Sequence, residues 1–94
     1  MNAPFPFDPL LCSRVRAGIL AFLSDRGAAD FTELAAVLEL PNNSLSSHLQ
    51  RLEGAAYIEL RRGFLGRKPR TRIVLTSVGR TAWLVHLARI TDPA

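Results

Sequence analysis

The residues with the most evident chemistry form two sets of hydrogen-bonding and cationic side chains. The first set lies within one expected helix, residues 43–55, and consists of Asn43, Ser44, Ser46, Ser47, Gln50 and Arg51. The second set consists of six basic residues within twelve positions that hold no acid, namely Arg61, Arg62, Arg67, Lys68, Arg70 and Arg72. Amide and hydroxyl groups can read the edges of base pairs, and dense positive charge attracts phosphate. Together they favour recognition of a polyanion.

No arrangement typical of catalysis or metal binding accompanies these two sets. Cys12 is the only cysteine, and His48 and His86 are far apart, so neither a disulfide nor a zinc site is expected. His48 has no acid or nucleophile visibly paired with it. Gly63 and Gly66 lack the strand-to-helix context of a nucleotide-binding loop. We therefore expect no enzyme activity, no metal and no cofactor.

Composition places the chain among folded single domains. Of its 94 residues 48% are apolar, which favours folding over disorder. The net charge is +4 and the pI is near 10.6. Outside residues 61–72 there are 6 basic and 8 acidic residues, so the excess positive charge lies in that one segment. Because there is no signal peptide and no apolar run long enough to span a bilayer, we expect a cytoplasmic protein.

Two short amphipathic helices joined by a tight turn are expected over residues 31–57. Their apolar positions follow helical spacing and are Leu34, Ala35, Val37 and Leu38 in the first helix and Leu45, Leu49 and Leu52 in the second. Thr32 is a suitable cap for the first helix, and Pro41 interrupts the chain after it. Asn42 or Asn43 offers a side-chain oxygen to the free N–H groups that open the second helix.

The chain before this pair predicts one further helix and a very short strand. Asp8 and Pro9 have the residue types of a helix start, and Ser13 offers a second start. Gly27 is expected to end the helix. A very short strand is then expected over residues 29–31.

The chain after the pair predicts a β-hairpin and a last helix. Strands are expected over residues 57–61 and 70–75, around a basic loop in which Gly63, Gly66 and Pro69 are the turn formers. Thr76 or Ser77 would cap the last helix. The order helix, short strand, helix, helix, strand, basic loop, strand, helix is that of a winged helix-turn-helix, mainly α with a small β-hairpin (an α+β fold).

The chain resembles the small winged helix-turn-helix transcription regulators related to the MarR and ArsR groups. The segments LSSHLQRLEGAAYIEL, GRKPRTRIVLT and LTSVGRTAW carry the resemblance, which covers about Asp8 to Ile90. One departure is Ala56, where the family usually has glycine. If that position needs a left-handed backbone, alanine costs about 1 kcal/mol. We expect one winged-helix domain over residues 1–94, with residues 1–7 as an N-terminal arm and residues 78–90 as a C-terminal dimerisation helix.

The function expected from these features is sequence-specific binding of double-stranded DNA by a transcriptional regulator. A recognition helix of about residues 43–55 would lie in the major groove, and a basic wing of residues 61–72 would lie on the backbone and minor groove. The candidate DNA-binding residues are Asn43, Ser44, Ser46, Ser47, His48, Gln50, Arg51, Arg62, Arg67, Lys68, Arg70 and Arg72. The resemblance implies that direct base contacts fall chiefly on Asn43, Ser44, Ser47 and His48.

Several of these features allow a plainer interpretation. The polar residues of the second helix could form an ordinary solvated face, and His48 could pack and donate one hydrogen bond instead of contacting phosphate. The wing cations could be merely solvated, although no carboxylate of their own segment relieves their repulsion. Cys12 is more simply a buried thiol than a redox sensor. The alternative function is a winged-helix protein–protein interaction module, which predicts an acidic partner and little dependence on salt.

The last helix predicts a homodimer, because its apolar positions surround it. Val78, Ala82, Val85 and Ile90 are expected to point into the core, with Trp83, Leu84, Leu87 and Ala88 nearby. A helix that is apolar on all sides must be buried on more than one side. The expected dimer interface comprises Phe5, Phe7, Leu10, Leu11, Trp83, Leu84 and Leu87. Alternatively the arm folds back and leaves a monomer. Any small-molecule effector would have to bind at the dimer interface.

Overall fold

A computed structural model describes residues 8–91, which contain four α-helices and a three-stranded antiparallel sheet. In chain order the elements are a 3₁₀ turn (Pro9–Leu11), α1 (Arg14–Arg26), β1 (Ala28–Asp30), α2 (Phe31–Leu38), α3 (Asn42–Gly54), β2 (Ile58–Leu65), β3 (Lys68–Leu75) and α4 (Ser77–Thr91). The predicted winged helix-turn-helix is therefore confirmed. None of the helices in this part of the chain is long and apolar enough to cross a membrane.

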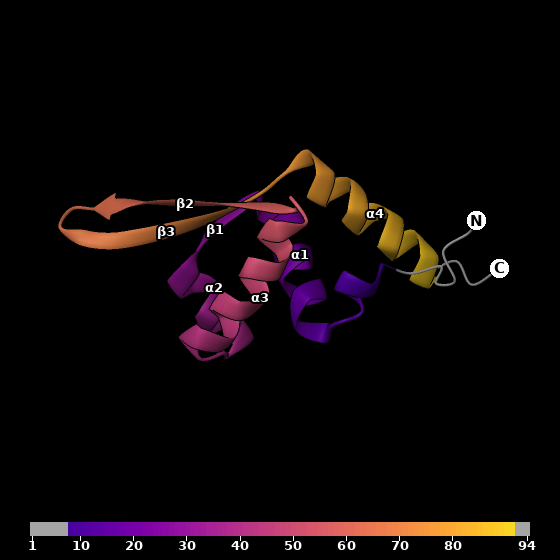
Figure 1. The fold of residues 1–94 in the computed structure, drawn as a ribbon, viewed down its shortest axis with the longest axis horizontal. Coiled ribbons are helices and arrows are strands. Elements are labelled where there is room, and N and C mark those ends of the chain that lie inside the picture. Colours follow the sequence, from indigo (N-terminus) through magenta and orange to yellow (C-terminus); the bar gives the residue numbers. More distant parts are fainter. Residues whose placement is uncertain (1–7, 92–94) are drawn as a thin grey trace.

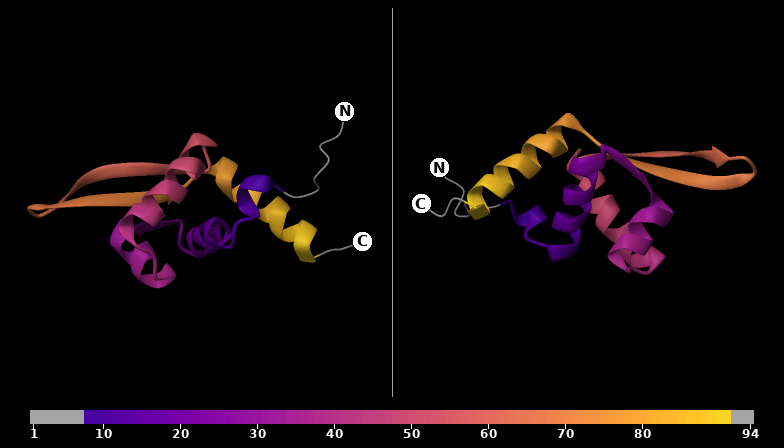
Figure 2. Two further views of the ribbon diagram at one scale, coloured as in Figure 1. Left: turned by 60° about the horizontal axis from the view of Figure 1, so that its bottom comes forward. Right: turned by 180° about the vertical axis from the view of Figure 1, so that it is seen from behind.

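The molecule is elongated, with the hairpin and the last helix at opposite ends. Its principal extents are 51 × 24 × 23 Å. The β2–β3 hairpin projects from one end, α4 extends toward the other, and α1, α2 and α3 gather between them (Figure 1). The further views in Figure 2 show the same separation of hairpin and α4. The two ends are therefore available for different contacts.

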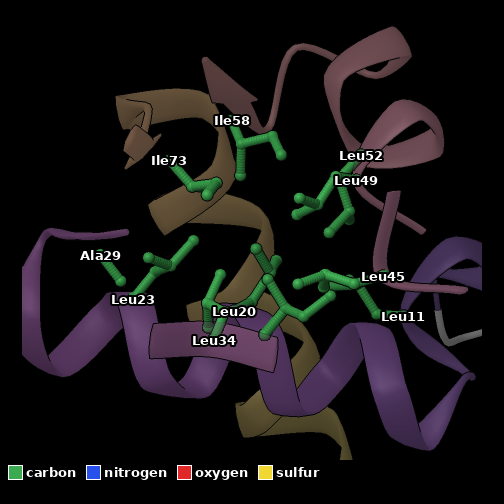
Figure 3. Close-up of a cluster of buried hydrophobic side chains, with 11 residues drawn as sticks. Leu11, Leu20, Leu23, Ala29, Leu34, Leu45, Leu49, Leu52, Ile58 and Ile73 are labelled. Carbon is green, nitrogen blue, oxygen red and sulfur yellow. The ribbon is translucent and has the colours of Figure 1, made fainter. Parts of the chain in front are cut away.

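A buried cluster joins the three central helices to the base of the sheet. Figure 3 shows these side chains, which are Leu11, Ile19, Leu20, Leu23, Ala29, Leu34, Leu45, Leu49, Leu52, Ile58 and Ile73. Of the leucines predicted for the helix pair, Leu38 only packs partly buried against the cluster, and Val37 is 53% exposed. The others lie in the cluster, namely Leu34, Leu45, Leu49 and Leu52. Burying such a side chain stabilises the fold by about 1.5–3 kcal/mol, so this cluster fixes how α2 and α3 lie against α1.

The hairpin is longer and its loop shorter than the sequence predicted. β2 and β3 pair from Ile58↔Leu75 out to Leu65↔Lys68, which leaves only Gly66 and Arg67 as the turn. The expected loop over residues 62–69 is therefore wrong. The pairing continues because Gly66 takes a φ of +65° at the first turn position, which suits a two-residue hairpin.

Proline in a strand is tolerated here because the sheet has three strands only at its base. β1 pairs with β3 no further toward the wing than Asp30↔Arg72. Beyond Arg72, β2 is the only strand beside β3 among residues 8–91, and proline is accepted on such an edge. Pro69 and Gly63 therefore lie inside strands of the wing and are not turn residues.

Most predicted helix starts are confirmed in detail. The Asp8 carboxylate accepts a hydrogen bond from the N–H of Leu10 at 3.0 Å, and the Ser13 hydroxyl accepts one from Arg16 at 3.3 Å. Gly27 ends α1 with a φ of +84°. At the start of α4, the Thr76 hydroxyl rather than that of Ser77 provides the cap, accepting from the N–H of Gly79 at 2.9 Å.

The starts of α2 and α3 differ from the prediction. Thr32 lies inside the first turn of α2 and does not cap it, because Asp30 at the end of β1 already occupies the N-cap position. Pro41 is the N-cap residue of α3. The Asn43 side-chain oxygen still accepts a bond from the N–H of Ser44 at 2.9 Å, as predicted for one of the two asparagines.

The inner side of α4 differs from the predicted one. Val78, Val85 and Ile90 are 53%, 45% and 51% exposed, so the expectation that they point into the core is wrong. The inner side consists of Gly79, Ala82, Trp83 and His86, of which Gly79 and His86 are buried. A Cβ atom on Gly79 would lie 2.1 Å from the carbonyl oxygen of Tyr57. α4 therefore begins in close contact with the chain that leads into β2.

Ala56 adopts the left-handed backbone conformation that the sequence raised as a possibility, with a φ of +64°. Its side chain is exposed, so glycine would lose no packing there. We expect Ala56→Gly to raise the free energy of unfolding by about 0.5–1 kcal/mol, because the strain on Cβ is removed. Urea denaturation measures the change.

The neighbouring residue provides a matched control. Ala55 has a φ of −89°, which any residue adopts. Ala55→Gly should lower stability or leave it unchanged, since glycine only adds freedom to the unfolded chain. Equal effects from the two substitutions would contradict a role for the positive φ of Ala56.

Candidate nucleic-acid interface

The outward face of α3 presents polar groups because its leucines occupy the inward face. Leu45, Leu49 and Leu52 are buried at spacings of four and three. The opposite side exposes the side chains of Asn43, Ser47, Gln50 and Arg51, while Ser44, Ser46 and His48 are half-buried at its margins. All seven are residues that the sequence proposed for DNA contact. The core thus determines which groups α3 offers to a partner.

The register of the hairpin separates the wing residues into two faces. Side chains alternate along a strand, and residues paired across an antiparallel ladder share a face. Leu60 pairs with Ile73, which is buried, so the same face continues outward through the pairs Arg62↔Thr71 and Phe64↔Pro69. The opposite face carries Arg61, Lys68, Arg70 and Arg72. The six cations therefore do not form one continuous patch.

Two carboxylates pair with three of the six cations and offset part of their charge, which corrects the expectation that their repulsion is unrelieved. Arg70 and Arg72 each donate to the same Asp30 oxygen at 3.0 Å, and Arg61 pairs with Glu59 at 3.1 Å. The hydrogen bond from Arg70 is the chief cause that lowers the pKa of Asp30. The sequence did not predict Asp30 as their partner, because 40 and 42 residues separate it from Arg70 and Arg72.

The other three cations lack such partners. Within residues 8–91, Arg62, Arg67 and Lys68 form no ion pair with a carboxylate. All three side chains are exposed. Arg67 is one of the two turn residues, and Lys68 follows it in the first pair of the hairpin. These three cations are therefore the ones available to an external anion.

A hollow links α3 to the wing. Its volume is about 230 Å³, and it is lined by Phe31, Ser46, Leu49, Gln50, Leu60, Arg62 and Thr71. Ser46 and Gln50 come from α3, whereas Arg62 comes from the wing face that continues toward Phe64. Polar groups of both elements therefore meet on one surface, with Arg62 as the cation beside them.

His48 packs at the edge of this face through a bond to α1. An Arg16 guanidinium nitrogen lies 3.1 Å from His48 Nδ1, and Arg16 also donates to the Leu10 carbonyl at 2.7 Å. A guanidinium can only donate, so Nδ1 accepts and the ring proton lies on Nε2. Burial, and then the charges of Arg16 and Arg51, lower the pKa of His48. A phosphate contact through Nε2 stays a prediction.

Cys12 and the Asp8–Tyr57 pair lie away from this face. Cys12 is exposed, so the expectation of a buried thiol is wrong; it directly follows the 3₁₀ turn that Asp8 caps. Asp8 also accepts a hydrogen bond from the Tyr57 hydroxyl, and burial together with this bond raises the pKa of Tyr57 to about 12. None of these residues lies among those that form the face described above.

Comparisons with known proteins agree with this architecture. A family model described as a winged helix DNA-binding domain matches residues 15–92. The protein MJ0432 of Methanocaldococcus jannaschii is 31% identical over 78 residues, which make up 83% of this chain and 85% of that protein.

Solved structures show the same fold. A transcriptional regulator homologue from Pyrococcus horikoshii OT3 is 31% identical and superposes with a TM-score of 0.77 over 89% of this chain and 86% of its own. A MarR family regulator from Neisseria meningitidis is 22% identical, with a TM-score of 0.64 over 86% of this chain and 56% of its own. The chain therefore spans little more than half the length of that regulator.

The lowered pKa of His48 predicts a pH dependence of stability. The unfolded chain takes up a proton on His48 as the pH falls through its ordinary value of 6.5, whereas the folded chain resists until a lower pH. His48 thus lowers the free energy of unfolding as the pH falls from 7.5 through 6.5 toward the folded pKa. We expect His48→Asn, whose oxygen can replace Nδ1 as acceptor, to lose less stability over this range.

Urea denaturation of both proteins between pH 7.5 and 5 measures the difference in slope, using pH values chosen on either side of 6.5. The comparison isolates His48 because every other titrating group is common to the two proteins. Parallel pH profiles would show that His48 titrates alike in the folded and unfolded chains.

Proposed function

We propose that the chain binds duplex DNA sequence-specifically to regulate transcription. It belongs to the family of winged helix DNA-binding domains, which are not enzymes, and it is similar to a transcriptional regulator homologue. The observation that carries this proposal is the surface shared by α3 and the wing. On it Ser46, Gln50 and Arg62 line one hollow, and no carboxylate lines it. Such a surface offers hydrogen bonds to base edges beside a charge for phosphate.

We place α3 in the major groove with its polar face toward the bases. Asn43, Ser47 and Gln50 are exposed, and their side chains have the groups that pair with base edges. Arg51 is exposed on the same helix and suits guanine or phosphate. Ser44, Ser46 and His48 are less exposed and would contribute at the edge of the contact.

The ion pairs divide the wing cations into two groups with different roles. Arg62, Arg67 and Lys68 would contact phosphate directly, since no carboxylate within the described residues 8–91 competes for them. Arg70 and Arg72 would first have to share or release Asp30. Their main role would be to hold the base of the wing against β1, with a weaker attraction to the backbone.

We expect binding to short duplexes to fall steeply with salt. With roughly 6–10 phosphate contacts in a dimeric complex, affinity should drop by about three to five decades between 50 and 200 mM salt, because bound counterions are released. Fluorescence anisotropy of labelled duplexes measures this. No binding at low salt, or an affinity that salt leaves unchanged, would exclude the proposed function and favour a protein-interaction module.

Two substitutions separate backbone contact from base reading in the same assay. Arg67→Ala should weaken all duplexes alike, because phosphates carry no sequence. Gln50→Ala should relax preference at a defined base by roughly 1–3 kcal/mol. Each residue thus serves as the control for the other.

We further propose that α4 mediates a two-fold homodimer. Five of the eight large apolar side chains that are exposed in residues 8–91 lie on this helix, namely Val78, Leu84, Val85, Leu87 and Ile90. Leu11 is only 1% exposed and belongs to the protomer's own core, so we leave it out of the interface. Trp83 packs partly against the same core, and Leu10 is half-buried there. Phe5 and Phe7 lie outside the described residues.

We expect the protein to sediment as a dimer at micromolar concentration, and Leu84→Asp or Leu87→Asp to shift it toward the 10.4 kDa monomer. A buried carboxylate without a partner would strongly oppose association. Val37→Asp is the matched control, because Val37 is similarly exposed but lies on α2. A wild-type protein that sediments as a monomer would exclude the α4 interface.

A further inference from the structure

The tip of the wing carries two apolar side chains that the contacts proposed above do not use. Phe64 is 72% exposed and Leu65 64%, the highest values among the large apolar residues described. Both directly precede the Gly66–Arg67 turn, where the hairpin projects away from the helices (Figure 1). Phe64 is not among the residues that pack against the core, and most of its surface is available to a partner.

The two side chains point in opposite directions. Phe64 pairs with Pro69 and shares the face of Arg62, whereas Leu65 pairs with Lys68 on the other face. Arg62 is also the wing residue that lines the hollow with Ser46 and Gln50 of α3. Phe64 therefore extends the surface proposed to face DNA, and Leu65 does not. Pro69, fixed in its backbone angle, lies beside the ring and stiffens its support.

The charge around Phe64 indicates which partner it meets. The chain contains no acidic residue between positions 60 and 91. Arg62, Arg67 and Lys68 surround the tip without a carboxylate partner among the described residues. An exposed ring that shares its face with Arg62, next to the turn that holds Arg67, fits an anionic surface that also has an apolar interior. Duplex DNA has both, since phosphates line the minor groove and stacked bases lie beneath them.

We propose that Phe64 is a wedge that enters the minor groove and partly unstacks one base step, so that the protein kinks the DNA it binds. This inference rests on the proposed DNA binding. Arg62, Arg67 and Lys68 hold the flanking phosphates while the ring takes the place of one base–base contact. Pyrimidine–purine steps such as TA unstack most easily, so the wing selects for deformable DNA without reading base edges.

The experiment uses the whole protein and duplexes that it selects from random sequence. The duplexes carry fluorophores at both ends to report bending by energy transfer, and 2-aminopurine at the step facing the wing to report unstacking. With wild type we expect a bend of about 20–90° and a rise in 2-aminopurine fluorescence. We also expect an affinity about tenfold higher for TA than for AA at that step, since one unfavourable base pair typically costs about that much.

Phe64→Ala should abolish the bend, the fluorescence rise and the preference for TA, while low-salt binding to any duplex is kept within a few fold. Leu65→Ala is the matched control, because it removes a similarly exposed side chain next in the chain on the opposite face, and it should bend DNA like wild type. Phe64→Trp should preserve bending. Circular dichroism verifies that the exposed positions tolerate these changes.

The outcomes separate this inference from the function on which it rests. A wild-type protein that binds no duplex overturns both. A protein that binds specifically but leaves the duplex straight and stacked overturns the wedge alone, as does a Phe64→Ala variant that still bends it. Binding of wild type to phosphatidylserine vesicles that requires Phe64, with unbent DNA, would assign the ring to a lipid surface and also overturn the wedge.

Discussion

The buried contacts at the base of the hairpin govern the rest of the interface, because they set its register. Ile58 and Ile73 lie in the core, and Leu60 packs against it opposite Ile73. Side chains alternate with a period of two, so a slip of one residue would turn every wing side chain to the other face. Apolar packing, rather than charge, therefore places Arg62 on the hairpin face beside α3 and Arg70 on the opposite face.

Short-range signals in the sequence predicted the elements and the hairpin, but not how far its strands pair or that β1 pairs with β3. The leucine spacing of α3, the caps at Asp8 and Ser13 and the break at Pro41 act within a few residues, so they can be read directly. The extent of the wing could not be read in this way, because glycine and proline between residues 62 and 69 are also typical of loops. Gly63 and Pro69 are strand residues only because the pairing of β2 with β3 continues outward from the core.

Charge was the least predictable property of the wing for the same reason. A count of acids within residues 61–72 missed Asp30. The antiparallel pairing of β1 with β3 brings Asp30 beside Arg72. The outcome is a wing in which three arginines nearer the base share two carboxylates, whereas Arg67 and Lys68 at the tip have no carboxylate partner among residues 8–91. Two of the three wing cations without a carboxylate partner among residues 8–91, Arg67 and Lys68, therefore lie at the far end of the hairpin.

The close backbone contact between Tyr57 and Gly79 fixes the position at which α4 begins. Thr76 donates its N–H to the Tyr57 carbonyl at 3.1 Å, and Gly79 leaves no room for even one carbon atom against that same oxygen. α4 is 15 residues long, about 22 Å at the usual rise, and this contact near its first turn is the pivot of any tilt. A tilt of a few degrees at the pivot moves its far end by more than an ångström. If two chains join through α4, the separation of their α3 helices therefore depends on the contact at Gly79 together with the packing of Ala82 and Trp83 against the core.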